Sequence, residues 1–325
     1  MSVLVIMEQR AGVLNRMSLE TLTGGAKVAT GLGIPLEAAV IGQGVAEVAG
    51  TVAAYGPTKT YMVEHELLAE YTPDGFAKAL DQLIRAKQPQ VVLFPHTYQV
   101  RDFAPKLVTR FGRALVSDVV DVKVDNSAVH FVRQLFQGKL NADFASSGDG
   151  AQFVSLQAGA FRAAQTHAEM GTVEAFAVEL VPSDIRSKAE APFREAQRSV
   201  DLSSAEMIVS VGRGIKEKEN LPLVEALAEA LGAELAASRP ICDNGWLPME
   251  RQVGSSGQTV APKVYFAVGI SGAIQHLVGM KGARTVVAIN SDENAPIFEV
   301  ADYGIVGDLF QVVPALTAEI KKVKA

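Results

Sequence analysis

Two apolar runs, each ending at a small or polar residue, constrain the fold more than any other feature of this sequence. The first run, 264–268, stops at Gly269, and a segment compatible with a helix follows Gly272 directly. The second run, 286–289, stops at Asn290. A strand, a glycine turn and a helix N-terminus bring unpaired backbone N–H groups and the positive end of the helix dipole together. This arrangement predicts a dinucleotide pocket, because glycine lets a pyrophosphate approach the backbone closely.

Length and composition limit the class of protein. A chain of 325 residues exceeds what one ordinary hydrophobic core holds, so we expect two domains. Hydrophobic residues make up 48% and charged residues 20% of the sequence, which is typical of a globular protein and not of a disordered one. The formal charge of −6 gives no reason to expect nucleic acid or an acidic membrane surface as a partner, because such partners recruit basic stripes.

Cysteine content and the first residues bear on the compartment. The single cysteine, Cys242, leaves no pair for an internal disulfide bond and suits a reducing compartment. The apolar run Val3–Met7 has no basic flank and is too short for a signal sequence, so it indicates a first strand. No apolar stretch reaches the ~20 residues that a membrane span needs. We therefore expect a cytoplasmic protein, or the mature form of an organellar matrix protein, with no membrane span.

Apolar runs alternate with helix-like segments along the first part of the chain. We expect strands at 3–7, 37–41, 91–94, 119–124, 128–136, 153–157 and 173–180, and helices at 18–30 and 73–87. Pro73 stands where a helix begins, and Phe76 and Leu80 follow at helical spacing. This rhythm predicts a mostly parallel α/β sheet flanked by helices.

The composition changes between Pro182 and Ser204, where charges interleave with prolines and no period emerges. Such a segment is typical of a linker between domains. We place the first α/β domain at residues 1–190, the linker at 191–204 and the second domain at 205–325.

The second domain repeats the strand–helix pattern. We expect strands at 207–211, 234–237, 263–268, 285–289 and 303–306. A helix begins near Pro222 and ends near Gly232, and the last helix runs from about Leu309 into the lysine-rich tail. The pattern predicts a second, Rossmann-like sheet with helices on its faces.

Five loops of the second domain follow the carboxyl ends of predicted strands, and each offers a glycine or a polar residue. They are Gly212–Gly214, Ser238–Arg239, Gly269–Gly272, Asn290 and Asp308. Ligands of open α/β sheets bind outside these carboxyl ends, so the five loops together favour a binding site. Each glycine alone is as consistent with an ordinary turn, and Gly212-x-Gly214 lacks the third glycine of the dinucleotide fingerprint.

Other kinds of chemistry find little support in the sequence. The Gly/Ser loop at 252–257 could wrap a polar ligand, but no Walker-type lysine accompanies it. The remaining histidines lack the spacing of metal ligands, so we expect no metal site; they are His65, His96, His130 and His167. Cys242 has no paired histidine, and no hydrolase triad is evident. His276 could be a histidine at the edge of the core as readily as a ligand.

Several segments of the second half closely resemble the signature of electron-transfer flavoprotein α subunits. The most specific is 264–292, with Val-Gly-Ile-Ser-Gly-Ala-Ile-Gln-His and Val-Ala-Ile-Asn-Ser-Asp. Shorter matches lie at 211–215, 237–240, 245–248, 251–254, 295–298 and 302–306. The first half resembles the family more loosely, at 91–95, 101–105 and 115–118. Its segment 157–161, Gln-Ala-Gly-Ala-Phe, departs from the Arg-Pro-Gly-containing version of the family.

The resemblance implies an FAD held by the second domain and an obligate heterodimer with a β subunit, which carries AMP or a second FAD and contacts the first domain. Such proteins are electron carriers rather than self-contained enzymes. They take electrons from dehydrogenases and pass them singly, through an anionic semiquinone, to a quinone-reducing oxidoreductase or another acceptor. The residues that match FAD-contacting positions of the family are Arg213, Ser238, Arg239, Val253, Gly254, Ser255, Ser256, Ser271, Gly272, Ala273, Ile274, Gln275, His276, Asn290, Asp308 and Leu309.

Three of these residues are expected to tune the flavin. Arg239 falls at the family position over the isoalloxazine, where a permanent cation favours the extra negative charge of a reduced flavin. Ser256 would offer its hydroxyl to flavin N5, and His276 would lie near the pyrimidine carbonyl. The backbone N–H groups of 270–273 would hold the pyrophosphate. Asn290 and Asp308 would bind the adenosine portion and the ribityl hydroxyls.

Alternative functions remain open at this point. Within the family, a bifurcating complex would oxidise NADH at a second flavin in the partner, and flavin stoichiometry separates it from a simple carrier. Outside the family, a nicotinamide-dependent dehydrogenase or transferase would need an acid or base beside the nicotinamide, for which only His276 is a candidate. A nucleotide-sensing module without redox activity is a third reading. A visible absorption spectrum distinguishes flavoproteins from both of these.

Overall fold

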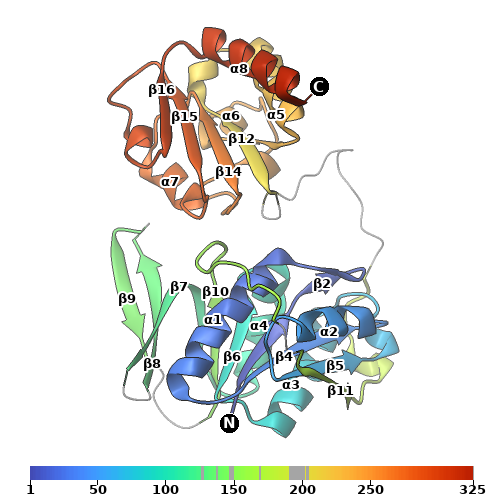
Figure 1. Ribbon diagram of the computed structural model, residues 1–325. Coiled ribbons are helices and arrows are strands. Elements are labelled where there is room, and N and C mark those ends of the chain that lie inside the picture. The colour runs from blue at the N-terminus through green and yellow to red at the C-terminus, as the bar shows by residue number, and fades with distance from the viewer. Residues whose placement is uncertain are drawn as a thin grey trace. The chain divides into compact units, whose positions relative to one another are not determined.

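In the computed structural model the chain divides into two compact units, Met1–Pro192 and Phe193–Ala325 (Figure 1). The structure describes residues 1–125, 128–136, 138–145, 150–167, 170–189, 202 and 205–324. The predicted linker, 191–204, lies outside the described residues except for Leu202. Each unit has its own parallel-dominated sheet with helices on both faces, which confirms the predicted fold class.

The first unit contains the following strands: β1 (Val3–Met7), β2 (Gln9–Arg10), β3 (Val13–Leu14), β4 (Leu36–Gly42), β5 (Lys59–Glu64), β6 (Val91–Pro95), β7 (Leu115–Asp125), β8 (Ala128–Leu135), β9 (Leu140–Phe144), β10 (Gln152–Leu156) and β11 (Thr172–Ala177). Its helices are α1 (Arg16–Leu32), α2 (Ala46–Ala53), α3 (Pro73–Lys87) and α4 (Tyr98–Thr109), with 3-10 turns η1 (Glu66–Leu68) and η2 (Pro182–Asp184).

The large sheet of the first unit has the strand order β11-β5-β4-β1-β6-β10-β7-β8-β9. All neighbours pair in parallel except β7–β8 and β8–β9, which are antiparallel. Helices α3 and α4 pack on one face and α1 and α2 on the other. Strands such as β1 and β6 are therefore buried on both faces, which explains their continuous apolar sequences.

Local capping fixes where the long helices begin. The Asn15 side chain accepts a hydrogen bond from the Met17 N–H at the start of α1, and Thr72 accepts one from Gly75 at the start of α3. Thr97 caps α4 in the same way through the Val100 N–H. Each cap satisfies a backbone donor that has no partner within the helix.

The second unit contains strands β12 (Met207–Val211), β13 (Glu234–Ala237), β14 (Val264–Val268), β15 (Val286–Asn290) and β16 (Tyr303–Val306). Its helices are α5 (Leu221–Leu231), α6 (Arg239–Asp243), α7 (Ile274–Met280) and α8 (Leu309–Lys324), with 3-10 turns η3 (Arg213–Ile215), η4 (Lys218–Asn220), η5 (Met249–Arg251) and η6 (Pro296–Glu299). The sheet is wholly parallel, in the order β13-β12-β14-β15-β16. Helices α5, α6 and α8 cover one face, and α7 and η6 cover the other.

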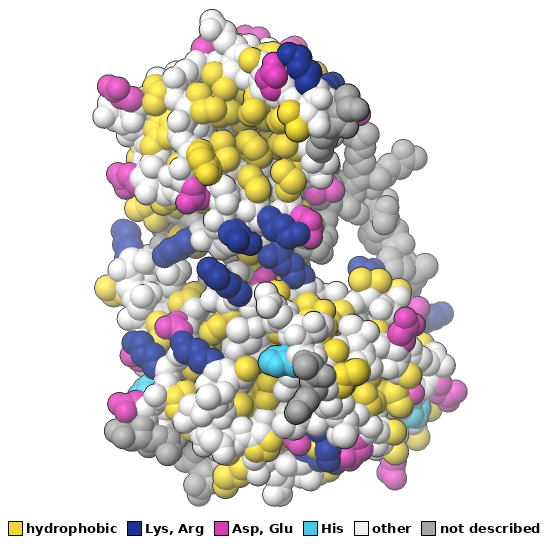
Figure 2. Space-filling model, in the orientation of Figure 1, with side chains coloured by type: hydrophobic (Ala, Val, Ile, Leu, Met, Phe, Trp, Pro, Cys, Tyr) yellow, Lys and Arg dark blue, Asp and Glu magenta, His cyan; other side chains and the backbone are white. Residues whose placement is uncertain are grey.

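The last strand of this sheet, β16, forms an exposed edge. Tyr303 is 66% and Val306 58% exposed, although both lie in a strand of apolar sequence. Figure 2 shows apolar side chains gathered on the visible face of the second unit. Groups of exposed apolar side chains of this kind commonly mark interaction surfaces.

The sequence missed six helices and strands of the first unit: α2, α4, β2, β3, β5 and β9. Helix α2 has only eight residues and no capping side chain, and α4 carries Pro105 inside its pattern. The segment from Pro182, where the composition changes, begins with a 3-10 turn rather than a loose chain. The ion pair Lys78–Asp184 and the hydrogen bond from the Arg186 N–H to Asp74 hold this segment to the first unit.

Candidate cofactor site

The five predicted loops all leave the carboxyl edge of the second unit's sheet. Gly212 follows β12, Ser238 follows β13, Gly269 follows β14, Asn290 ends β15 and Asp308 lies two residues beyond β16. Because every pair in this sheet is parallel, these residues share one edge. The structure thus brings together the loops that the sequence singled out.

Glycines let the loops after β12 and β14 interlock through their backbones. A Cβ on Gly212 would overlap the carbonyl oxygen of Gly269, and one on Gly214 would lie 2.7 Å from the Gly269 Cα. The Gly214 N–H donates to the Gly269 carbonyl at 3.0 Å. Any larger side chain at either position would push the two loops apart.

The loop after β14 presents a run of backbone donors. Within the described part of the chain, none of the N–H groups from 270 to 275 donates a hydrogen bond. The carbonyls of this loop are tied down instead: the Asn290 side-chain amide donates to Ile270 at 2.9 Å, and the Ile297 N–H donates to Ser271 at 3.1 Å. Gly272 adopts φ +88°, and a Cβ there would overlap Ile297. Hydrogen bonds to its carbonyl groups therefore fix the loop, whereas its N–H groups have no acceptor among the described residues and remain available to a ligand.

The Gly/Ser loop at 252–257 lies directly on helix α7. A Cβ on Gly279 would overlap the Gly254 backbone, and the Ser255 N–H donates to the Gln275 carbonyl at 2.7 Å. The buried Gln252 amide donates to the Ser256 hydroxyl oxygen at 2.9 Å. Ser256 therefore accepts a hydrogen bond and keeps its own O–H to donate elsewhere.

His276 is a buried side chain in the first turn of α7. Its Nε2 lies 2.9 Å from the hydroxyl oxygen of Tyr265 on β14, and its Nδ1 has no hydrogen-bond partner among the described residues. Burial lowers the pKa of His276 to about 4. The ring is thus neutral at physiological pH. Its interior position fits the interpretation of His276 as a histidine at the edge of the core, and the Val253 backbone opposes the pKa shift in part.

The other expected site residues differ in exposure. The buried ones are Ser238, Val253, Gly254, Gly272 and Leu309, and the exposed ones are Arg213, Arg239, Ser255, Ser256, Ser271, Ala273, Ile274, Gln275 and Asp308. Arg239 stands apart, since its guanidinium pairs with Asp243 at 3.2 Å on α6. Asp308 accepts a hydrogen bond from the Phe310 N–H and so caps α8.

The sequence did not identify Tyr265 or Ile297 as parts of this site. Tyr265 lies inside an apolar strand, where only its hydroxyl distinguishes it from its apolar neighbours. Ile297 acts through its backbone N–H, which no sequence pattern reveals. Cys242 is buried in α6, and burial raises its pKa to about 11, with the carboxylates of Asp243 and Glu250 adding to the shift.

Among the described residues, no group of three or more His, Cys, Asp or Glu side chains is placed to hold a metal ion. No described helix has both the length and the apolar character to cross a membrane.

Comparison with known proteins gives matches along both units. Residues 3–181 match the electron transfer flavoprotein domain, and residues 201–281 match the electron transfer flavoprotein FAD-binding domain. The electron transfer flavoprotein subunit alpha of Thermoanaerobacterium thermosaccharolyticum is 39% identical over 322 residues, covering 98% of each chain. The subunit of the same name from Bacillus subtilis is 38% identical, covering 98% of this chain and 97% of that protein.

A third relative carries a different name. The acryloyl-CoA reductase electron transfer subunit beta of Anaerotignum propionicum is 36% identical, covering 98% of this chain and 95% of that protein. The matches confirm the resemblance that the sequence suggested and extend it over nearly the whole chain. The chain belongs to the electron transfer flavoprotein α-subunit family.

Proposed function

We propose that this chain is the FAD-binding α subunit of a heterodimeric electron-transfer flavoprotein of the cytoplasm. It receives electrons from dehydrogenases and passes them to a quinone-reducing oxidoreductase or another acceptor. Its β subunit carries AMP or a second FAD. Family membership supports the electron-transfer role, while the particular partners and cofactors belong to the proposal. The chain acts as a carrier whose substrates are other redox proteins.

The run of free backbone donors at 270–275 carries the proposal. Consecutive N–H groups that have no acceptor among the described residues can bind an anion. The pyrophosphate of FAD is such an anion. Asn290 contributes by holding the Ile270 carbonyl, which keeps the neighbouring N–H groups turned away from internal acceptors. The glycines at 212, 214 and 272 let these loops pack backbone against backbone, which helps to hold the donor run in its shape.

The polar side chains near this run fit the isoalloxazine end of the same cofactor. FAD supplies the redox chemistry when it is bound. The free O–H of Ser256 is suited to flavin N5, and the resemblance to the family implies that His276 lies near the pyrimidine carbonyl. The exposed Arg239, which pairs with Asp243, would place a cation near the flavin and favour negative charge on it. Asp308 keeps one carboxylate oxygen for the ribityl or adenosine hydroxyls.

A nicotinamide-dependent dehydrogenase receives no support from this arrangement. His276 was the only candidate acid or base for that chemistry, and burial lowers its pKa to about 4. A general acid or base works best with a pKa near the operating pH.

Co-expression of the chain with its β subunit, followed by absorption spectroscopy and cofactor extraction, tests the proposal. We expect a yellow heterodimer that releases FAD. One flavin per heterodimer, together with AMP, indicates a simple carrier, and two flavins indicate a bifurcating complex. A colourless heterodimer that takes up no added FAD contradicts the proposal.

A further inference from the structure

Lys216 has a backbone conformation that residues with a side chain rarely adopt. It follows η3 near the carboxyl edge of the second unit's sheet, with φ 68° and ψ −55°. The Glu217 N–H donates to the Ile215 carbonyl at 2.9 Å, so the chain forms a γ-turn of the rare, strained hand around Lys216. By contrast, Gln88 at the end of α3 has φ 48° and ψ 54°, the ordinary left-handed conformation of helix ends. Strain of the kind seen at Lys216 persists only where the surrounding structure holds it.

Contacts on both sides of the turn hold it in place. The Ile215 side chain is fully buried, and its carbonyl also accepts a hydrogen bond from the Asn220 side-chain amide at 2.9 Å. The Lys216 N–H donates to the Arg213 carbonyl at 3.0 Å, and the Lys216 Nζ lies 5.1 Å from the centroid of the Phe310 ring. A cation over an aromatic ring is an attractive contact. The turn is therefore anchored through its backbone and through its side chain.

The turn directly follows the glycine loop 212–214, which packs against the start of the donor run. The Gly212 N–H donates to the Val268 carbonyl at 2.9 Å, and the Gly214 N–H donates to the Gly269 carbonyl at 3.0 Å. Neither glycine has room for a Cβ, so the backbone conformation alone determines how closely the two loops approach. The direction that the chain takes after Gly214 thus decides whether the glycine loop stays against Gly269.

We propose that the strained turn at Lys216 fixes the glycine loop 212–214 against Gly269 and so preorganises the donor run for its ligand. Lys216 is then a positioning residue, which acts through the backbone of the two loops. The effect of the turn on the loop is a property of this chain alone, whereas FAD as the ligand rests on the proposed function. Strain kept beside a binding loop trades stability for a fixed loop shape, and a preformed loop costs less to order when the ligand binds.

Lys216→Gly tests the turn in the full-length chain, because glycine adopts this conformation without strain and allows others as well. We expect the melting temperature Tm to rise by about 3 °C, since the strain is relieved. Hydrogen–deuterium exchange of the amides of 212–215, measured by mass spectrometry and corrected for intrinsic rates, should become about fivefold faster.

Lys218→Gly is the matched control. Lys218 lies in η4 and has no positive φ, so glycine relieves no strain there. Its Tm should fall by about 2 °C, and the exchange of 212–215 should stay as in the wild type. A Tm that falls in Lys216→Gly as it does in the control, or unchanged exchange of 212–215 in Lys216→Gly, overturns the proposal.

Opposite changes in stability and in ligand binding separate this role from a merely structural one. In the heterodimer, Lys216→Gly should bind FAD about fivefold more weakly although the chain is more stable, whereas loss of a residue that only supports the fold would lower both. Wild-type FAD affinity together with faster exchange overturns the role of the turn in binding. A wild-type heterodimer that takes up no FAD contradicts the proposed function instead, and Tm and exchange of the chain alone still decide whether the turn fixes the loop.

Discussion

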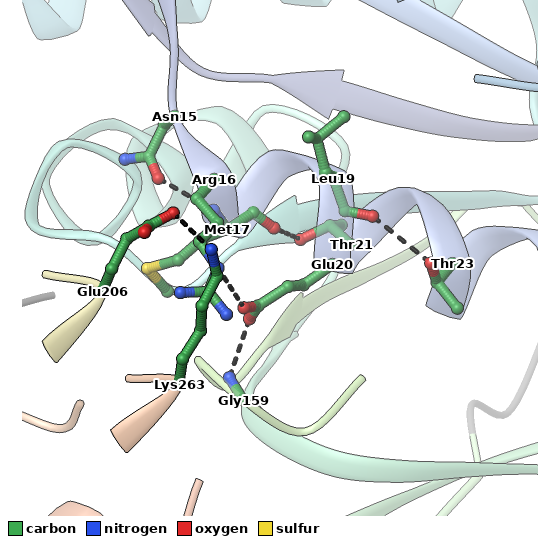
Figure 3. Close-up of polar contacts among 10 residues, drawn as sticks. All are labelled: Asn15, Arg16, Met17, Leu19, Glu20, Thr21, Thr23, Gly159, Glu206 and Lys263. Atoms are coloured by element: carbon green, nitrogen blue, oxygen red, sulfur yellow. Dashed lines mark hydrogen bonds and ion pairs between the residues drawn. The ribbon is translucent and has the colours of Figure 1, made fainter. Parts of the chain in front are cut away.

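Both units contain parallel-dominated sheets of apolar strands, but they differ in the partners of the backbone N–H groups near the carboxyl edges of those sheets. In the first unit, some of these N–H groups donate to side chains of the chain. The Gly159 N–H, three residues beyond β10, donates to the buried Glu20 carboxylate at 2.7 Å, and the Arg16 guanidinium lies 3.6 Å from that carboxylate (Figure 3). In the second unit, the N–H groups of 270–275 have no such acceptor among the residues that the structure describes.

Side-chain acceptors also lie at other positions near this edge of the first unit. Glu8, which follows β1, accepts hydrogen bonds from Asn15 and Thr97, so a carboxylate of the chain lies beside the starts of α1 and α4. The His96 Nδ1 and the Ser155 hydroxyl oxygen are 2.9 Å apart, and the Asp118 N–H donates to the same hydroxyl oxygen. A parallel sheet alone therefore does not make a ligand site. In the proposed site, glycine loops stand where side chains would otherwise supply acceptors.

The largest effect is expected when a side chain is added to a glycine of the donor loop 270–275. Gly272→Ala places a Cβ against Ile297 at φ +88°. Strain of ~3 kcal/mol corresponds to about 100-fold weaker FAD binding by the heterodimer. Fluorescence titration with FAD measures the affinity. Gly50→Ala, in open space on α2, is the matched control and should bind FAD normally. Wild-type affinity in Gly272→Ala would show that the loop does not hold the ligand.

A smaller change removes the tie that keeps the donor run in place. Asn290→Ala deletes the amide that donates to the Ile270 carbonyl. The loss of a partly buried hydrogen bond costs about 1–1.5 kcal/mol, or close to tenfold in FAD affinity. Asn294→Ala, on the exposed turn that follows β15, should leave the affinity unchanged. Equal affinities in both variants would mean that the loop keeps its shape without Asn290.

The third test concerns charge rather than shape. Arg239→Ala should lower the one-electron reduction potential of the flavin, because a cation favours the reduced, negatively charged form. The side chain is 66% exposed, so solvent screens much of its effect. We expect a shift on the order of 40 mV in a reductive titration. Lys263→Ala removes a cation from the opposite edge of the sheet and should leave the potential in place. A wild-type reduction potential in Arg239→Ala would show that Arg239 does not act on the flavin.

The smallest effect is expected in the first unit. Burial raises the pKa of Glu20 above its ordinary value of 4.5, and the Gly159 N–H and Arg16 oppose this in part. Folding therefore favours the protonated form, and the stability it gives is lost as the pH rises from near 4.5 through the folded-state pKa. Glu20→Gln keeps an acceptor for Gly159 and carries no charge, so it should gain stability relative to the wild type over that range. Urea unfolding at several pH values measures this, with the exposed Glu70→Gln as control. A stability difference between Glu20→Gln and the wild type that does not vary with pH would contradict the raised pKa of Glu20.

The sequence predicted most of the fold because buried parallel strands are continuous apolar runs. Strands β12, β13 and β16 and helix α3 have the predicted bounds. It missed α2, which is short and lacks a capping side chain, and α4, whose Pro105 interrupts its pattern. The loops at the carboxyl edge were predictable from their glycines, since backbone that approaches backbone requires that residue.

The partners of the site residues were not predictable. The hydrogen bond from Asn290 to Ile270 joins two loops twenty residues apart, and the pairing of Tyr265 with His276 depends on how α7 lies against β14. The sequence identified His276 as either a core residue or a ligand, and the structure places its ring in the interior of the second unit. The roles of Arg239, Ser256 and the other expected contacts with FAD remain proposals, which the variants above address.

The enclosed position of Cys242 in α6 has a practical consequence for such experiments. Its thiol is shielded, and with a pKa of about 11 very little thiolate, the reactive form, is present near neutral pH. Because the chain has no other cysteine, a cysteine introduced at an exposed position would be modified selectively by maleimide reagents. The natural protein thus serves as its own unreactive background for attaching fluorophores or spin labels, with no need to replace Cys242 first.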